Sequence, residues 1–86
     1  MSKTSNLTII VRNKDKILYN GQAYAVSSVN DKGPFDILSE HENFITLIKN
    51  KIIIYTTPKE KKEIQIDNGI VKVYEDKIQI YVNFKV

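Results

Sequence analysis

The strongest constraint on the fold is the number and spacing of β-branched residues. Isoleucine occurs fourteen times, valine seven times and threonine five times among the 86 residues, whereas alanine occurs only twice. β-branched side chains suit a pleated strand better than a helix, because their χ1 rotation is already restricted. Near the end of the chain, Ile78, Ile80, Val82 and Phe84 alternate strictly with more polar residues. This period of two is typical of a strand with one buried face, and it favours an all-β fold.

Further extended segments follow along the whole chain. They cover residues 7–12, 17–19, 22–29, 35–38, 44–48, 51–57, 63–67 and 70–84, the last as a hairpin. Asn68-Gly69 predicts a tight hairpin turn or a bulge, since both residues tolerate positive φ. Gly21 predicts a bulge or sharp bend that lets one strand serve two sheets. With no segment of helical period, we expect about eight to ten short strands in a small antiparallel β-sandwich or flattened barrel.

The length of 86 residues allows one small domain. We expect residues 1–6 to form a disordered polar tail and residues 7–86 to form the domain. The first residues lack the apolar stretch of a secretory signal, and no apolar run approaches the ~20 residues that span a bilayer. A cytoplasmic location is therefore the default expectation.

The residue types needed for most catalytic chemistry are scarce. Cysteine is absent and His41 is the only histidine, so thiolate catalysis and cysteine-ligated zinc are excluded. The three glycines are far apart, which excludes a standard phosphate-binding loop. Asp36, Glu40, His41 and Glu42 form the one cluster suited to acid–base or metal chemistry. A solvated loop or an acidic protein-binding loop explains this cluster better than an active site, which would need a pocket at His41. We expect no cofactor and no metal.

The basic charge allows a second interpretation. The net charge is +3, and Tyr19, Tyr24, Tyr55, Tyr74 and Tyr81 could form a stacking platform for single-stranded nucleic acid. However, twelve of the thirteen basic residues are lysine, whereas phosphate recognition favours the arginine fork. Lysines at strand ends more often protect sheet edges and maintain solubility. A stand-alone nucleic-acid-binding β-barrel therefore stays as the alternative hypothesis.

Five segments carry a pattern more specific than strand content. They are Leu7–Val11 with Ile17–Gly21, Val26–His41, Glu42–Ile48, Ile66–Val73 and Lys77–Val82. The second ends in a glycine, a short apolar strand and a histidine, which is similar to the motif G-x-[FL]-x-[IV]-L-x-x-H. In this order and spacing the segments resemble the N-terminal β-sandwich domain of the epsilon subunit of F-type ATP synthases, called delta in mitochondria. The resemblance runs from about Leu7 to Val82.

Several turn positions depart from the family pattern. Ser39-Glu40 replaces the usual Pro-Gly before the histidine, and Asn43 replaces the proline after it. Asn50-Lys51 replaces a later Pro-Gly turn, and Asn68 replaces one glycine of a pair. Asparagine is the next best residue at positive φ, so these changes suit turns. Many family members also carry a two-helix hairpin after the sandwich, which we do not expect in this chain.

The resemblance implies a non-catalytic subunit of the central stalk. Such a rotor subunit links the gamma subunit to the membrane c-ring and transmits torque in ATP synthesis driven by protons or sodium ions. The resemblance places one loop region against the polar loops of the c-ring, which are often basic in the family: Pro34, Asp36, Ser39, Glu40, His41, Glu42 and Asn43. Gamma would bind a separate exposed sheet surface. The chain would lie at the cytoplasmic face of the membrane, attached only through the complex, without binding nucleic acid.

Overall fold

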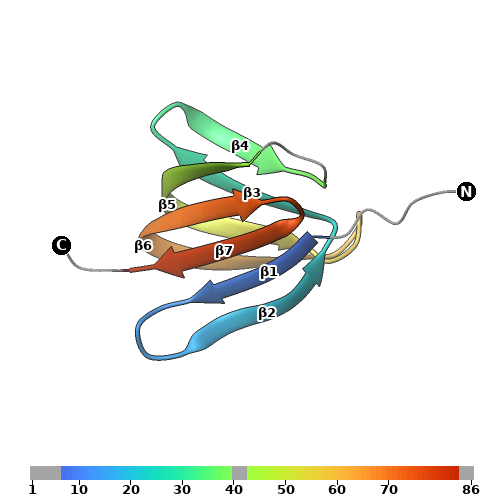
Figure 1. The fold of residues 1–86 in the computed structure, drawn as a ribbon, viewed down its shortest axis with the longest axis horizontal. Helices are drawn as coiled ribbons and strands as arrows, with labels where there is room; N and C mark the ends of the chain where they lie inside the picture. Colours follow the sequence, from blue (N-terminus) through green and yellow to red (C-terminus); the bar gives the residue numbers. More distant parts are fainter. Residues whose placement is uncertain (1–6, 40–42, 84–86) are drawn as a thin grey trace, which may run out of the picture.

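Seven β-strands make up most of the chain in a computed structural model, which describes residues 7–39 and 43–83. The strands are β1 (Leu7–Arg12), β2 (Ile17–Ala23), β3 (Ala25–Asn30), β4 (Gly33–Ile37), β5 (Phe44–Tyr55), β6 (Lys61–Tyr74) and β7 (Lys77–Val82). The all-β prediction is confirmed (Figure 1). Within the described residues, no helix is long and apolar enough to span a membrane.

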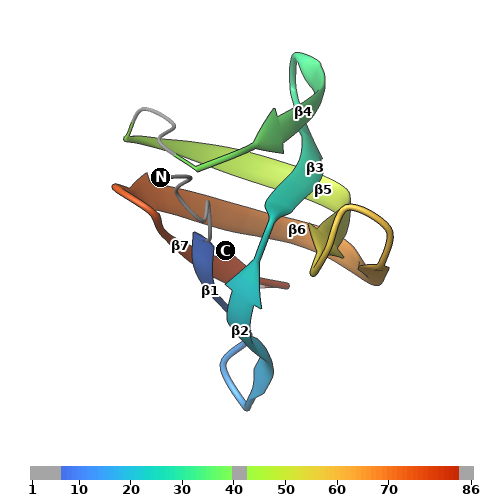
Figure 2. The same ribbon diagram turned by 90° about the vertical axis from the view of Figure 1, so that its right-hand side faces the viewer.

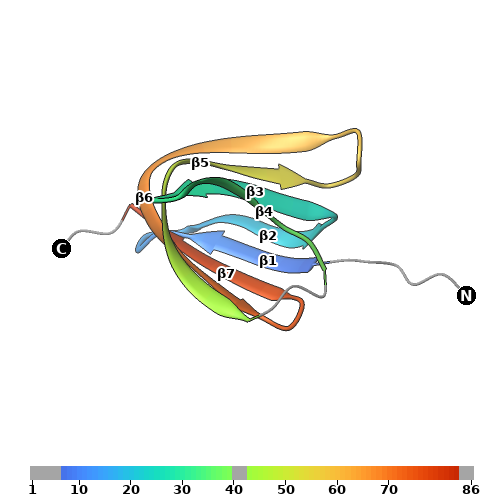
Figure 3. The ribbon, with the colours of Figure 1, turned by 90° about the horizontal axis from the view of Figure 1, so that it is seen from above.

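The strands form one continuous hydrogen-bonded sheet that folds over itself. Its order is β2-β1-β7-β6-β5-β3-β4. All neighbouring strands are antiparallel except β1 and β7, which are parallel. The long strands β5 and β6 run from one side of the molecule to the other (Figure 2), and both are strongly curved (Figure 3). Each long strand therefore belongs to both layers. The first layer consists of β2, β1, β7 and one half each of β5 and β6. The second layer consists of β3, β4 and the other halves of β5 and β6.

The curvature of the long strands arises at a paired irregularity. Lys49 lies opposite Asn68 and Asn50 lies opposite Ile66, so Asp67 is an extra residue in β6. Asn50 has a φ of 75°, a left-handed conformation that asparagine tolerates better than most residues. The bulge that the sequence allowed near Asn68 is therefore present, and the hairpin turn is not. Because the chain continues through both bends, seven strands form where eight to ten were expected.

The break between β2 and β3 lies at Tyr24, not at Gly21 as predicted. Gly21 pairs regularly with Ile9 across the β1–β2 ladder. Glycine suits this position because the Tyr19 ring lies close by. A Cβ at Gly21 would lie 3.3 Å from the Tyr19 hydroxyl oxygen. That hydroxyl donates to the carbonyl of Gln22 at 3.0 Å. The Tyr19 side chain thus lies against the backbone of an edge strand, which helps to shield the edge from unwanted pairing.

The core lies between the two layers and consists mainly of isoleucine and valine. Residues exposed by less than 2% come from six strands and include Leu7, Ile9, Val11, Val26, Ile37, Ile52, Ile54, Val71, Ile78, Ile80 and Val82. These are the inward positions of the period-two patterns. Ser28 is the one buried polar residue within the described part of the chain, and its hydroxyl donates to the Lys51 carbonyl at 2.7 Å. This hydrogen bond satisfies the hydroxyl inside the core.

Candidate functional site

The outer face of the first layer presents several large apolar side chains to solvent. Inward and outward positions alternate along a strand. The chain neighbours of buried residues therefore point outward, and the buried residues here are Ile9, Val11, Val71, Ile78 and Ile80. The outward residues are Thr8, Ile10 and Arg12 of β1, Lys77, Gln79 and Tyr81 of β7, Ile70, Lys72 and Tyr74 of β6, and Ile45 and Leu47 of β5. We call this set the outer face.

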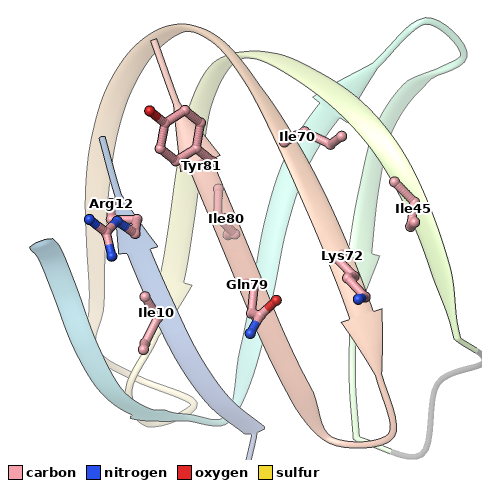
Figure 4. Close-up of a pocket in the computed structure, with 8 residues that line it drawn as sticks. All are labelled: Ile10, Arg12, Ile45, Ile70, Lys72, Gln79, Ile80 and Tyr81. Atoms are coloured by element: carbon pink, nitrogen blue, oxygen red, sulfur yellow. The ribbon is translucent and has the colours of Figure 1, made fainter. Parts of the chain in front are cut away.

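Strand register arranges these residues in two rows across four strands. One row runs Arg12, Tyr81, Ile70, Leu47, and the next runs Ile10, Gln79, Lys72, Ile45. Figure 4 shows these side chains, except that of Leu47, spread over β1, β7, β6 and β5. Directly opposed side chains lie close enough to touch, so each row forms a continuous strip.

Two of the most exposed apolar side chains of the described chain lie here. Ile45 and Leu47 are each 62% exposed, and Tyr74 is 54% exposed. A shallow hollow of about 440 Å³ opens between Ile10, Ile45 and Ile70. Contiguous apolar surface of this kind on a small protein marks an interaction site, because leaving it in water is unfavourable.

The charges of the outer face have one sign. Arg12, Lys72 and Lys77 are its charged residues, and none of its outward strand positions carries a carboxylate. Apolar side chains with basic ones among them match a partner surface that presents apolar side chains and acidic groups.

Two members of the predicted acidic binding region, Pro34 and Asp36, lie away from the outer face. Pro34 and Asp36 belong to the edge strand β4, and Ser39 follows that strand by two residues. Glu40, His41 and Glu42 lie outside the described residues. Pro34 and Asp36 alternate with the buried Ile37, so they face away from the core on the second layer. The structure therefore places Pro34 and Asp36 on a different layer from the outer face.

Asn43 has a role within the fold. Its side-chain oxygen accepts a hydrogen bond of 2.6 Å from the backbone N–H of Glu75, in the turn between β6 and β7. Glu75 has a φ of 57°, so this turn has an uncommon backbone conformation for a residue other than glycine. Asn43 thereby fixes the start of β5 to the far end of the β6–β7 hairpin.

The five tyrosines do not share one surface. Tyr74 and Tyr81 lie on the outer face, Tyr24 and Tyr55 line a pocket on the second layer, and Tyr19 lies against Gly21. The single stacking platform considered from the sequence is therefore not formed by all five residues.

Of the four residues that could serve acid–base or metal chemistry, the structure describes only Asp36. Among residues 7–39 and 43–83, no three His, Cys, Asp or Glu side chains gather as potential metal ligands. The hydroxyl of Ser27 donates to one oxygen of Asp36 at 2.5 Å, which orients the carboxylate.

Sequence reasoning missed the outer face, although a signal exists. Ile10, Leu47 and Ile70 each stand next to a buried apolar residue, so these strands show two consecutive apolar residues where one face should be polar. A strand that is apolar on both sides indicates that both faces become covered. Only the strand order shows that these positions form one surface.

Comparison with known proteins places the chain among a well-defined group. The sequence model of one family, described as "ATP synthase, Delta/Epsilon chain, beta-sandwich domain", matches residues 6–85. The chain is 32% identical over 79 residues to a protein of Sulfurimonas denitrificans named "ATP synthase epsilon chain". That match covers 91% of this chain and 61% of the relative, so the chain spans about three fifths of its length.

Two solved structures have a similar fold. A chain of the Euglena gracilis mitochondrial ATP synthase, determined as an OSCP/F1/c-ring assembly, superposes with a TM-score of 0.85 at 13% identity. The match covers 100% of this chain and 56% of that one. A chain of the Tetrahymena thermophila mitochondrial ATP synthase central stalk and c-ring gives a TM-score of 0.75 at 12% identity, covering 91% and 63%. At these identities the similarity is one of fold.

Proposed function

The chain belongs to the family of ATP synthase delta and epsilon chains through their β-sandwich domain, and from this membership we propose that it acts as a non-catalytic central-stalk subunit. In this proposal it is the epsilon subunit of an F-type ATP synthase driven by protons or sodium ions. It links gamma to the c-ring and transmits torque during ATP synthesis. It lies at the cytoplasmic face of the membrane and is attached there through the complex.

The observation that carries the proposal is the outer face. A rotor subunit must hold its neighbour through an interface that survives rotation, and such an interface needs a buried apolar centre. Ile45 and Leu47 supply exposed apolar area that the isolated chain has no reason to retain. We assign this face to gamma, which in this proposal presents apolar side chains with carboxylates opposite Arg12 and Lys72.

In this proposal the c-ring contact belongs to the acidic region that begins on β4 of the second layer. There we retain the residues inferred from family resemblance: Pro34, Asp36, Ser39, Glu40, His41, Glu42 and Asn43. The carboxylates would face basic polar loops of the c-ring, where exposed charge pairs orient docking and each contributes only about 0–1 kcal/mol. The separation between the outer face and β4 supports this division, since it lets one small domain hold both neighbours at once.

Co-purification with gamma from the same source tests the first contact. Ile45→Glu places a carboxylate on the outer face without disturbing the core, because the side chain is 62% exposed. We expect it to weaken gamma binding by at least about tenfold. Ile53→Glu is the matched control, since Ile53 alternates with buried Ile52 and Ile54 and so faces outward on the second layer. Equal binding by both folded variants would contradict the assignment of the outer face.

Assembly with the c-ring tests the second contact. The double variant Glu40→Lys/Glu42→Lys reverses the proposed charge match, so we expect weaker c-ring assembly while gamma binding stays normal. Loss of gamma binding in this variant, or normal c-ring assembly, would contradict the proposed division of surfaces.

The outer face also provides one argument for the alternative function. Arg12, Lys72 and Lys77 lie there beside Tyr74 and Tyr81, a combination used in single-strand binding. The aliphatic centre of the face and the family membership favour a protein partner. Oligonucleotide binding that weakens steeply with salt would support the alternative.

A further inference from the structure

A second pocket lies on the outer side of the second layer, above β3. Its floor is made of small residues, Ala25 and Ser27, at alternate positions of β3. Ser27 pairs with Asp36 of β4, and Ala25 pairs with Tyr55 of β5. Because both flanking strands carry larger side chains than β3, a hollow of about 220 Å³ remains between them.

Two tyrosines and a leucine form the apolar walls. The N–H of Tyr24 donates to the carbonyl of Tyr55 at 2.7 Å, which fixes the two residues side by side. Tyr24 is 46% exposed and Leu38 is 51% exposed, and both line the hollow. The pocket thus presents aromatic and aliphatic surface that a ligand would remove from water.

Asp36 is the one charged group among the described residues that line the pocket. Its Oδ1 accepts the hydroxyl hydrogen bond of Ser27, which orients the carboxylate. Within the described part of the chain this carboxylate has no further hydrogen bond or ion pair. Among residues 7–39 and 43–83, Oδ2 therefore has no hydrogen-bond donor. Lys61 lies opposite Tyr55 in the β5–β6 ladder, but its exposed side chain does not line the pocket.

We propose that this pocket receives an arginine side chain from a partner protein. A carboxylate next to tyrosine rings is suited to a cation, because the ring faces and the carboxylate both attract positive charge. Arginine suits the site better than lysine, since its planar guanidinium is weakly hydrated, stacks on aromatic rings and donates several hydrogen bonds.

This inference deepens the proposed function. It rests on that function only in one respect, namely that the partner is a neighbouring subunit of the complex. The pocket chemistry is tested on the isolated chain, without gamma or the c-ring. Failure of the arginine site and failure of the rotor assignment therefore give different results.

The test is a titration of the ¹⁵N-labelled chain, followed by amide chemical shifts, with the blocked tripeptide acetyl-Gly-Arg-Gly-amide. We expect saturable shifts centred on Tyr24, Ser27, Asp36 and Tyr55, with a Kd of about 1–10 mM for a single side chain. The same tripeptide with citrulline has nearly the same shape and no charge, and it should give no saturable shift. The lysine tripeptide should bind several-fold more weakly.

Variants of the chain separate the pocket from general attraction of cations. Asp36→Asn keeps an acceptor for the Ser27 hydroxyl and removes the charge, so we expect at least about tenfold weaker binding. Asp31→Asn removes an exposed carboxylate outside the pocket and should leave binding unchanged. Unperturbed shifts elsewhere in both variants confirm that the fold is retained. Equal binding of the citrulline peptide, binding that survives Asp36→Asn, or no saturable shift would overturn the proposal.

Discussion

Gly69 offers the sharpest test of how the two layers pack at the bend of β6. It is buried, and it lies between Ile48 of β5 and Val82 of β7 in the sheet. A Cβ at this position would lie 3.0 Å from Cγ1 of Ile48, 3.2 Å from its Cδ1 and 3.2 Å from the carbonyl oxygen of Tyr81. Carbon atoms in good contact are separated by about 3.5–4.0 Å. Gly69→Ala therefore crowds a buried side chain and a backbone atom, and neither can move away freely.

The magnitude follows from two opposing effects. Overpacking of a filled core costs about 1–3 kcal/mol. The φ of Gly69 lies outside the left-handed region, so alanine also gains about 0.4–1 kcal/mol by restricting the unfolded chain. We expect a net loss of about 1–2 kcal/mol in the free energy of unfolding. For a domain of this size, this lowers Tm by about 5–15 °C.

A double-mutant cycle identifies the cause. Ile48 is 3% exposed, and Ile48→Ala alone should cost about 2–4 kcal/mol because it leaves a cavity. In that background the added methyl group enters the space that Cγ1 and Cδ1 occupied. The cost of Gly69→Ala should then fall below about 0.5 kcal/mol, which corresponds to a coupling of at least about 1 kcal/mol.

Urea unfolding followed by far-ultraviolet circular dichroism measures all four proteins of the cycle. Tyrosine fluorescence provides a second probe, since the chain has no tryptophan. Coincident transitions would justify a two-state treatment. If Gly69→Ala is neutral in the native background, or costs the same with Ile48 and with Ala at position 48, the packing argument is refuted.

Three asparagines at bends give the remaining predictions. Asn43→Ala removes the acceptor for the Glu75 N–H and should cost about 1 kcal/mol in urea unfolding, whereas Asn43→Asp keeps the oxygen and should stay near wild type; an equal loss in both would contradict the hydrogen-bond role. At Asn50, where φ is 75°, Asn50→Ala should lower stability by about 1 kcal/mol while Asn50→Gly does not, and the reverse order of Tm values would exclude backbone strain as the cause. Asn83 has a φ of 57°, and its side-chain oxygen accepts a hydrogen bond from the Asp67 N–H at 2.8 Å. Hydrogen exchange of the Asp67 amide should therefore accelerate about tenfold in Asn83→Gly and in Asn83→Ala, and Asn83→Ala should also be less stable. Unchanged exchange in both variants would show that Asn83 does not hold the bulge.

The sequence was sufficient for the strands and their buried sides. The alternation at Ile78, Ile80 and Val82 predicted β7 and its inward face, and all three residues are buried. This works because a strand has a side-chain period of two regardless of its neighbours, so local pattern and burial agree. Strand spacing predicted a sandwich or flattened barrel, and the family resemblance, carried by five ordered segments, is supported by the family match.

The positions of the bends were harder to predict. The sequence treated Lys49-Asn50 and Asn68-Gly69 as breaks between separate strands, yet both lie inside continuous strands and face each other across one ladder. Asparagine and glycine signal that positive φ is possible, but they do not distinguish a turn from a bulge. The choice depends on whether the chain on each side continues to pair, which is a tertiary property.

The candidate sites show the same division. The chemistry of single residues was visible, so Asp36 could be chosen for its charge, but its placement beside Tyr24 and Tyr55 required the β3–β4 and β3–β5 registers. The Asn43 side chain, assigned to partner binding from resemblance, also holds the Glu75 turn, 32 residues away in sequence. No local pattern encodes such a contact.

The sequence by itself determined that this chain forms strands, which side of each strand is buried, and which family it resembles, because these depend on local period and on motif order. The tertiary structure alone decided that β1 lies parallel to β7 and that β5 and β6 serve both layers. Those choices bring Ile10, Ile45 and Ile70, from three separate strands, to one hollow. Strand order sets which outward residues become neighbours, and it depends on how the whole core closes, not on any single segment.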